Sequence, residues 1–454
     1  TCFIDKKIRM NFAYKPLYTR DQPFFEARII GLFFFSLFFT SNILLQFNSA
    51  SKVVGILVVM VLPFILISAG IYYYYKIFQL KQLNPIDLII FLSLILPLYN
   101  AITVHLIFDV KILKALFNLS SRFYVVMCSL IYYAIRSKKI TLKQFVYANL
   151  LLCWFCFALY TFVSLTIPPA TFMNSLGDGL VGFNPSKGGY IYRFSSSVLV
   201  FGMIYYFLDY MMKSNFKSLL LWMILMAYQV FVDKGRTELV SEIVPMFLFM
   251  FLILKWHEIA KKLFVIFTLT AIVILIAYLI DPKIVEFTAD MYWMFIKFFM
   301  GQKTGEGSAD LRWTEMAAVY DYLVQHPEYI FFGIGCPKKE IIQANIGTVI
   351  LGDIGVVGGL LSQGIVGLIF IYSVFLYPIY VWRVVKHYRN DLIFNAGILG
   401  CGTVFIQSLF NGNIFYSFLG IMVPLIIVEY YRVKEKFYWR ELKSKQQNQS
   451  EKEL

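Results

Sequence analysis

Three arginine residues have the chemistry to hold a phosphate group. Arg312 lies in the polar segment GSADLRWTEMAAVYDYLVQHPEYIFFGIG, residues 307–335, which interrupts an otherwise apolar chain. Arg236 stands beside Thr237 in a Gly-Arg-Thr turn, and Arg193 follows a glycine-rich stretch. A guanidinium is planar, stays charged and binds phosphate oxygens through two parallel N–H groups. A helix opening at the Gly-Arg-Thr turn would add free backbone N–H groups. The three arginines are therefore candidate ligands for a diphosphate.

Asp353 is the candidate carboxylate. It lies in LGDIGVVGGLLSQGIVGLI, residues 351–369, just before a long apolar run. A charge at the mouth of a membrane helix is costly unless it is paired or hydrated, so such a residue is a functional candidate. Asp is also a favoured N-cap of a helix, and a purely structural capping role is the alternative interpretation. For each arginine the alternative is a side chain that reaches the surface or pairs with a nearby carboxylate.

The elements that must position these residues are membrane helices. The chain has 454 residues, of which 59% are hydrophobic and 15% charged, whereas a soluble domain has about half and a quarter. Runs of roughly twenty apolar residues predict about twelve spans. They lie near 29–47, 53–75, 86–108, 113–135, 145–167, 194–212, 218–232, 237–254, 262–280, 355–382, 391–410 and 413–431. The fourth is weakened by Asn118, Ser120, Ser121 and Arg122.

The distribution of lysine and arginine predicts the orientation. Basic residues cluster before the first span, after every second span and in the C-terminal tail, whereas the intervening short loops have few. Cytoplasmic loops carry this excess, so both termini are predicted to be cytoplasmic. The net charge of +14 is then mostly a topology signal, and no nucleic-acid partner is implied. Arg193, Arg236, Arg312 and Asp353 are predicted on the outer side.

The spans and loops divide the chain into four regions. Residues 1–280 form an N-terminal transmembrane region of about nine helices, 281–354 a large outer loop, 355–431 the C-terminal helices, and 432–454 a basic tail. Connections longer than about fifteen residues are usually functional. Apolar residues at helical spacing predict two helices in the large loop, over 283–300 and 309–326. A second outer segment runs from about 168 to 193.

No metal site or cofactor is predicted. The four histidines, His105, His257, His326 and His387, are far apart along the chain, and acidic residues on the outer side are scattered. Cys153 and Cys156 have CxxC spacing but no accompanying second pair or histidine cluster, which favours small core residues. We therefore expect no requirement for a divalent ion.

Several of these residues together resemble one family. Arg312-Trp313, His326-Pro327 and Phe332-Gly333-Ile334-Gly335 resemble a recurrent segment of the O-antigen polymerase and ligase superfamily. GRTELV, at 235–240, resembles that family's helix-opening turn, and the stretch after Asp353 resembles its entry to a late span. The motif region covers roughly 233 to 370. Thr237, Trp313, Gly333 and Gly335 are the candidate supporting residues.

The resemblance implies an architecture similar to GT-C glycosyltransferases and an inner-membrane site that faces the periplasm. It implies a metal-independent polymerase that transfers glycan from undecaprenyl diphosphate to the non-reducing end of the next lipid-linked unit. Asp353 would act on the acceptor hydroxyl as a base, and the arginines would stabilise the leaving diphosphate. Partners would be the lipid-linked oligosaccharide, membrane lipid and a chain-length regulator protein.

Two alternatives remain open. Ligases of the superfamily carry histidine where this chain has Asp353, which favours polymerase over an O-antigen or related oligosaccharyl ligase. A polytopic transporter or flippase also fits many spans and outer arginines. The sequence shows neither the internal repeat nor the central charges typical of a transport path.

Overall fold

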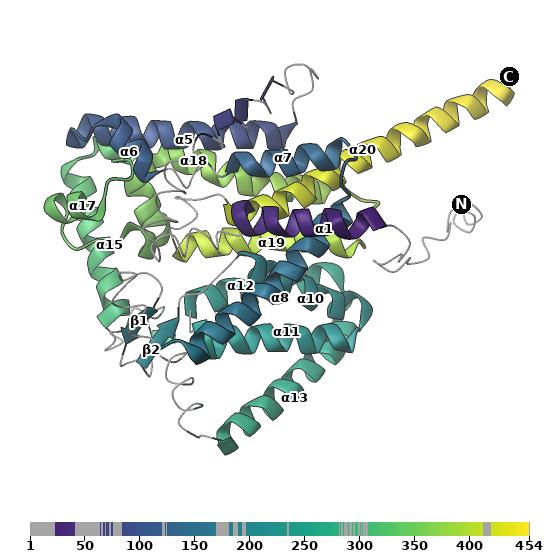
Figure 1. Cartoon of the computed structure of the whole chain (residues 1–454), viewed down its shortest axis with the longest axis horizontal. Helices are drawn as coiled ribbons and strands as arrows, with labels where there is room; N and C mark the ends of the chain where they lie inside the picture. Colours follow the sequence, from purple (N-terminus) through teal and green to yellow (C-terminus); the bar gives the residue numbers. More distant parts are fainter. Residues whose placement is uncertain are drawn as a thin grey trace.

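The computed structural model describes residues 23–40, 84–119, 125–168, 181–184, 189–192, 197–233, 236–280, 307–411 and 419–453, with single positions at 123 and within 64–75 and 282–302. These residues form a helical bundle with one short β-hairpin (Figure 1). The first half contains α1 Pro23–Phe35, the π-helix η1 Ser36–Thr40, α5 Pro85–Phe108, α6 Ile112–Asn118, α7 Val125–Arg136, α8 Leu142–Thr166, β1 Val181–Asn184, β2 Gly189–Tyr192 and α10 Ser197–Lys213. The second half contains α11 Phe216–Tyr228, the π-helix η5 Gln229–Asp233, α12 Arg236–Ile253, α13 Trp256–Ile280, α15 Gly307–Gln325, α16 Glu328–Phe332, α17 Lys339–Asn345, the 3-10 turn η6 Leu351–Asp353, α18 Gly355–Val384, α19 Leu392–Phe410 and α20 Leu419–Glu453.

The helices have the length and composition of a membrane protein. Within the described residues, five are long and apolar enough to cross a bilayer: Pro85–Phe108, Leu142–Thr166, Trp256–Ile276, Gly355–Val384 and Leu392–Phe410. Each is apolar around most of its circumference, as lipid-facing helices are, because water is absent on every side. Many of their large apolar side chains are exposed on the outside of the bundle. The predicted class, a helical membrane protein, agrees with this architecture.

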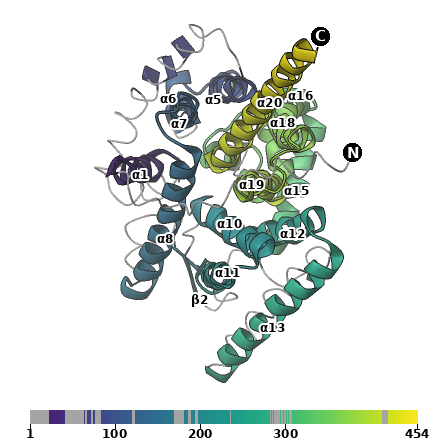
Figure 2. The same cartoon turned by 90° about the vertical axis from the view of Figure 1, so that its right-hand side faces the viewer.

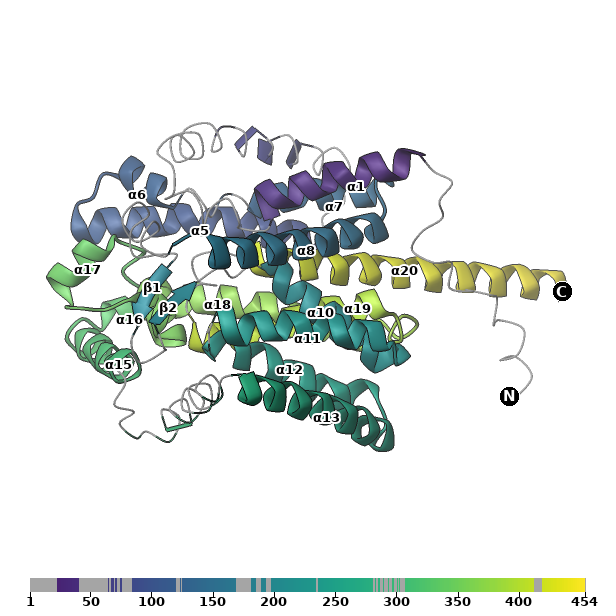
Figure 3. The same cartoon turned by 60° about the horizontal axis from the view of Figure 1, so that its bottom comes forward.

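The bundle has two dissimilar ends. α6, α15, α17 and the hairpin gather at one end, which we call the loop end, and α20 projects from the opposite end, the tail end (Figures 1 and 3). In the hairpin, Val181 pairs with Tyr192 and Asn184 with Gly189. α13 lies at the margin of the bundle, apart from α5 and α7 (Figure 2). The predicted large outer loop is thus at the end of the bundle opposite the C-terminal helix.

The core consists of one large cluster and smaller ones. The large cluster runs through the bundle and includes Phe145, Tyr160, Phe207 and Phe394 among its largest buried side chains. A separate cluster lies at the loop end, where Val319 and Leu323 of α15 pack with side chains from α17 and α18. The large loop therefore has its own hydrophobic core.

Three predicted elements differ from the observed ones. The predicted span 113–135 is two shorter helices, α6 and α7, because Asn118 and the polar residues after it interrupt the apolar run. The predicted tail 432–454 continues α20 as helix to Glu453, since Lys, Glu, Gln and Arg are good helix formers. The outer segment 168–193 contains the unpredicted hairpin. The predicted elements 53–75 and 283–300 lie mostly outside the described residues.

Candidate functional site

Helix α15 carries Arg312 and places a second charged residue beside it. The predicted helix 309–326 corresponds to α15, Gly307–Gln325. Glu315 is one turn after Arg312 and shares the buried face of α15 with Val319 and Leu323, at a spacing of four residues. Trp313, in contrast, is 48% exposed. α15 therefore presents one acidic residue to the loop-end core and an arginine near its edge.

Glu315 is a buried carboxylate with few neutralising contacts. Its side chain is 2% exposed, and its Oε1 accepts a hydrogen bond from the Ile350 backbone N–H at 3.2 Å. Burial raises the pKa of this carboxyl, and the negative charge of Asp353 raises it further. The Ile350 hydrogen bond and the positive charge of Arg312 oppose that rise in pKa without cancelling it. Arg312, Glu315 and Asp353 therefore form one electrostatic group, which we call the loop-end charge cluster.

Asp353 is not a helix cap. It is the last residue of η6, and its backbone N–H donates to the Ile350 carbonyl at 2.9 Å. The N-cap position of α18 is occupied by Ile354, which makes no side-chain capping hydrogen bond. Asp353 itself is exposed at the surface of the loop end. The capping alternative therefore does not apply, and the carboxylate is accessible to a ligand.

The Gly333–Gly335 segment docks into a break in α18. Gly364 interrupts the helical conformation of α18 with φ 65° and ψ 179°. The Ile334 N–H donates to the Leu361 carbonyl at 2.8 Å, so the loop pairs with the helix just before this break. A Cβ at Gly333 would lie 2.6 Å from the Ser362 carbonyl oxygen, and one at Gly364 would lie 2.3 Å from that of Phe331. Both positions thus need glycine for backbone contact as well as for positive φ.

Helix α5 completes this junction. The Tyr99 hydroxyl donates to the Phe332 carbonyl oxygen. The Asn100 side chain is fully buried and donates to Gln363 Oε1 at 3.1 Å. A Cβ at Gly335 would lie 2.7 Å from the Asn100 carbonyl oxygen. Gly333 and Gly335, two of the residues predicted to support the site, therefore lie where the large loop is anchored between α5 and the broken α18.

The other two predicted arginines are not placed in this group. Arg236 and Thr237 begin α12, as the helix-opening turn predicts, but their side chains lie outside the described part of the structure. Arg193 also lies outside it. Their role in a diphosphate site remains a prediction. Among the described residues, no group of three His, Cys, Asp or Glu side chains lies together.

An apolar cavity adjoins the start of α12. Its volume is about 510 Å³. It lies between α11, the first turns of α12 and the second half of α13, and its side chains include Met226, Val240, Ile243 and Val273. Among its described lining residues, Thr270 alone carries a hydroxyl group. Such a cavity suits an aliphatic chain.

The sequence prediction missed Glu315, Asn100 and Gln363. Glu315 has a signal in the sequence, since it falls one helical turn after Arg312 and in line with Val319 and Leu323. Asn100 and Gln363 lie inside long apolar runs, where a buried polar residue is often functional or structural. Their mutual contact joins positions 263 residues apart, which no local pattern shows. Compared with protein-family models, curated proteins and solved structures, the chain matches none.

Proposed function

We propose that this protein is a glycosyltransferase that polymerises undecaprenyl-diphosphate-linked oligosaccharide repeat units at the outer face of the bacterial inner membrane. The proposal includes about twelve spans, cytoplasmic termini, a GT-C-like architecture and a periplasmic loop end. The observation that carries it is the geometry of the loop-end charge cluster: Glu315 lies one helical turn after Arg312 and accepts a hydrogen bond from the Ile350 N–H, three residues before Asp353. The motif resemblance and the two predicted roles involve the same two residues.

The chemistry needs one cation and one carboxylate near the reacting sugar. The acceptor hydroxyl oxygen forms a bond to the anomeric carbon of the donor while the bond from that carbon to the diphosphate oxygen breaks. The hydroxyl proton passes to the Asp353 carboxylate, and the electron pair of the broken bond stays on the diphosphate. Arg312 stabilises the charge that grows on this leaving group, which favours the transition state over the ground state. Arg236 and Arg193 would also stabilise the negative charge on the leaving diphosphate.

Glu315 has a positioning role in this scheme. It is buried, so it does not reach the substrate, and it lies within electrostatic range of both reacting side chains. The negative charge of Glu315 attracts the Arg312 side chain and repels that of Asp353. It therefore favours an arrangement in which Arg312 stays beside α15 and Asp353 stays apart from it, just before α18. A substrate bound between them would meet opposite charges on opposite sides.

The lipid part of the substrate has a fitting cavity. The cavity of about 510 Å³ is lined by apolar side chains from the first turns of α12. α12 begins at Arg236, so a diphosphate at its N-terminus would leave the first isoprene units beside this cavity. The arrangement supports a polyprenyl donor over a water-soluble nucleotide sugar.

The test is polymerisation by the purified protein from lipid-linked repeat units alone. Wild type should yield a ladder of products that differ by one repeat, with or without EDTA. Arg312→Ala should reduce kcat/KM by about 100-fold or more, as loss of one transition-state donor does, and Arg312→Lys should restore part of it. Asp353→Asn should abolish the ladder without lowering the melting temperature, because the residue is exposed and caps no helix.

Arg383→Ala, at an exposed position in the last turn of α18, is the matched control and should leave the ladder unchanged. A full ladder from Arg312→Ala would contradict the diphosphate role. Loss of the ladder in EDTA, with recovery on adding magnesium, would contradict metal-independent catalysis. If wild type leaves the units unextended but transfers glycan to added lipid A core, the ligase alternative replaces the polymerase.

A further inference from the structure

A cavity of about 910 Å³ lies at the tail end. Its walls are the residue before α5, the end of α7, the turn into α8, and α20 from Tyr430 to Arg440. Among the described residues that line it, none is acidic and six are cationic: Arg136, Lys138, Arg432, Lys434, Lys436 and Arg440. The polymerase proposal gives this cavity no role, since the loop-end charge cluster is at the other end of the bundle.

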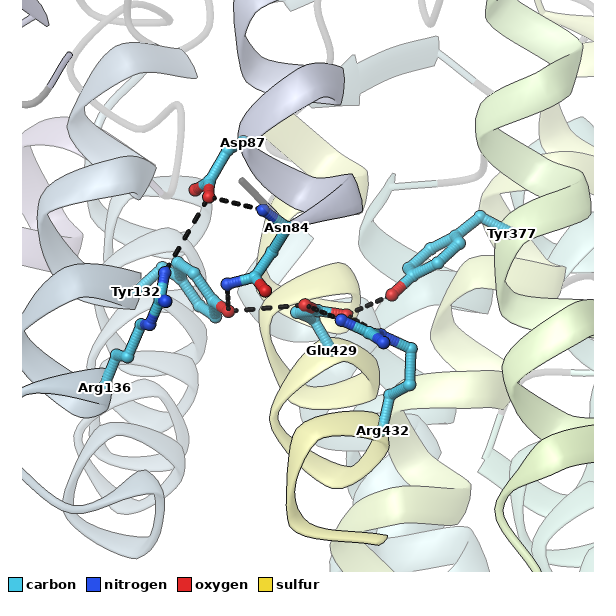
Figure 4. Close-up of polar contacts among 7 residues, drawn as sticks. All are labelled: Asn84, Asp87, Tyr132, Arg136, Tyr377, Glu429 and Arg432. Carbon is cyan, nitrogen blue, oxygen red and sulfur yellow. Dashed lines mark hydrogen bonds and ion pairs between the residues drawn. The ribbon is translucent and has the colours of Figure 1, made fainter. Parts of the chain in front are cut away.

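Two of the six cations are neutralised at the floor of the cavity (Figure 4). Arg136 lies 3.8 Å from the buried carboxylate of Asp87. Arg432 donates to both oxygens of Glu429, at 2.7 and 2.8 Å. Asn84 and Tyr132 link the two pairs. The Asn84 backbone N–H donates to Asp87 at 2.9 Å, its side-chain amide donates to the Tyr132 hydroxyl at 3.0 Å, and that hydroxyl donates to Glu429 at 3.3 Å. This network fixes the shape of the floor and leaves its charge balanced.

The other four cations have no such ion pair; the charge of Asp391 acts on Lys434 from a greater distance. No described carboxylate lies within ion-pair distance of Lys138, Lys434, Lys436 or Arg440. The Lys434 ammonium lies 4.3 Å from the centre of the Tyr388 ring, a cation–π contact that leaves its charge in place. Lys138, Lys436 and Arg440 are exposed at the rim. Four like charges around one cavity repel one another, and a bound anion would relieve that repulsion.

The lining also shows what kind of anion fits. Apolar side chains alternate with the cations and include Ile135, Ile140, Leu142 and Phe437, the last of which is 57% exposed. A ligand with a phosphate group and an attached apolar chain would satisfy both kinds of wall. Arginine and lysine are the residues that bind phosphate, and basic pockets between membrane helices bind anionic headgroups.

We propose that this tail-end cavity binds the phosphate of an anionic phospholipid headgroup. Lys138, Lys436 and Arg440 contact the phosphate at the rim, Lys434 adds charge at the wall, and the acyl chains run along the apolar residues. Free phosphate shares the headgroup chemistry but lacks the chains. The proposal is independent of the polymerase reaction and requires only that the apolar helices stand in a membrane.

The experiment measures lipid retention by native mass spectrometry of the purified full-length protein. The protein is delipidated and titrated in parallel with phosphatidylglycerol, phosphatidylcholine and inorganic phosphate. Wild type should retain one phosphatidylglycerol at concentrations where it retains no phosphatidylcholine. The triple variant Lys138→Gln, Lys436→Gln, Arg440→Gln should weaken this binding at least ten-fold. All three side chains are exposed, and an unchanged melting temperature would show that the variant folds.

A second triple variant is the matched control. Lys139→Gln, Arg383→Gln and Lys386→Gln remove the same charge from exposed positions that are not among the residues lining the cavity. This variant should bind phosphatidylglycerol as wild type does. Equal losses in the two variants would overturn the cavity as a site, and equal retention of both lipids would overturn anion recognition. Inorganic phosphate that binds as tightly as phosphatidylglycerol would overturn the lipid assignment.

Discussion

The two ends of the bundle each contain a buried glutamate that lies three residues from an arginine in a helix. At the tail end, Glu429 is fully buried and holds Arg432 through two hydrogen bonds, with Tyr132 and Tyr377 as further donors. At the loop end, Glu315 accepts a bond from a backbone N–H, and its carboxyl is raised in pKa by burial and by the charge of Asp353. The same residue pair at the same spacing thus gives a neutralised pair at one end and a charge cluster at the other.

This difference indicates which end is organised for structure and which for chemistry. A carboxylate whose charge is fully matched contributes to a fixed shape, whereas a buried carboxylate near a second acid is typical of functional sites. The loop end also gets its shape from backbone contacts at Gly333 and Gly364, which leaves its charged side chains available. The tail end gets its shape from the charged side chains themselves. Three predictions test this contrast.

The largest effect is expected at the glycine junction of the loop end. Gly364→Ala would place a Cβ 2.3 Å from the Phe331 carbonyl oxygen at a positive φ of 65°. The backbone clash and the left-handed conformation should together cost about 4 kcal/mol of unfolding free energy. The melting temperature of the purified protein measures it. Gly402→Ala, in α19 with nothing within 4 Å of the new methyl group, is the control and should be neutral or slightly stabilising. Equal melting temperatures for the two variants would show that the junction does not depend on backbone contact.

A smaller loss is expected from the ion pair of the tail end. Glu429→Gln removes the charge that Arg432 needs and keeps only one of the two oxygens that accept from Tyr132 and Tyr377. We expect a cost of about 2 kcal/mol, less than for a wholly buried pair because the Arg432 side chain keeps 17% exposure. Glu441→Gln, exposed on the same helix, should have no effect on the melting temperature. If Glu429→Gln has the same melting temperature as wild type, the charged side chains do not stabilise the tail end, and the contrast between the two ends fails.

The sequence predicts the elements of both ends better than their contacts. α8, α18 and α19 begin and end within three residues of the predicted spans. A long apolar run predicts a membrane helix, and its polar ends mark where the helix begins and ends. Arg312 and Asp353 were predicted as site residues from their unusual positions. Glu315 was missed because it stands among polar residues, and its hydrogen-bond partner Ile350 is 35 residues away in the chain. Glu429 and Asp87 were also missed, because contacts that bury them come from other helices: Tyr132 of α7 donates to Glu429, and Arg136 of α7 pairs with Asp87.

The smallest effect is expected from Glu315, and it depends on pH. The folded-state pKa of this carboxyl lies above its ordinary value of about 4.3, the value expected when the chain is unfolded. A raised folded pKa contributes stability that is fully present below the unfolded pKa and is lost as pH rises through the folded value. The melting temperature of wild type should therefore fall as pH rises from about 4 toward neutrality. Glu315→Gln keeps the shape and the oxygen that accepts from Ile350 but cannot ionise. The variant should match wild type near pH 4 and melt at a higher temperature at pH 7, because it lacks a buried charge that Arg312 only partly offsets.

Glu340→Gln, at an exposed position of α17, is the control and should have the melting temperature of wild type at every pH. If Glu315→Gln instead melts below wild type at pH 7, the charge of Glu315 is stabilising, as that of Glu429 is. The two glutamates would then have the same structural role, and the loop-end charge cluster would lose its distinguishing feature.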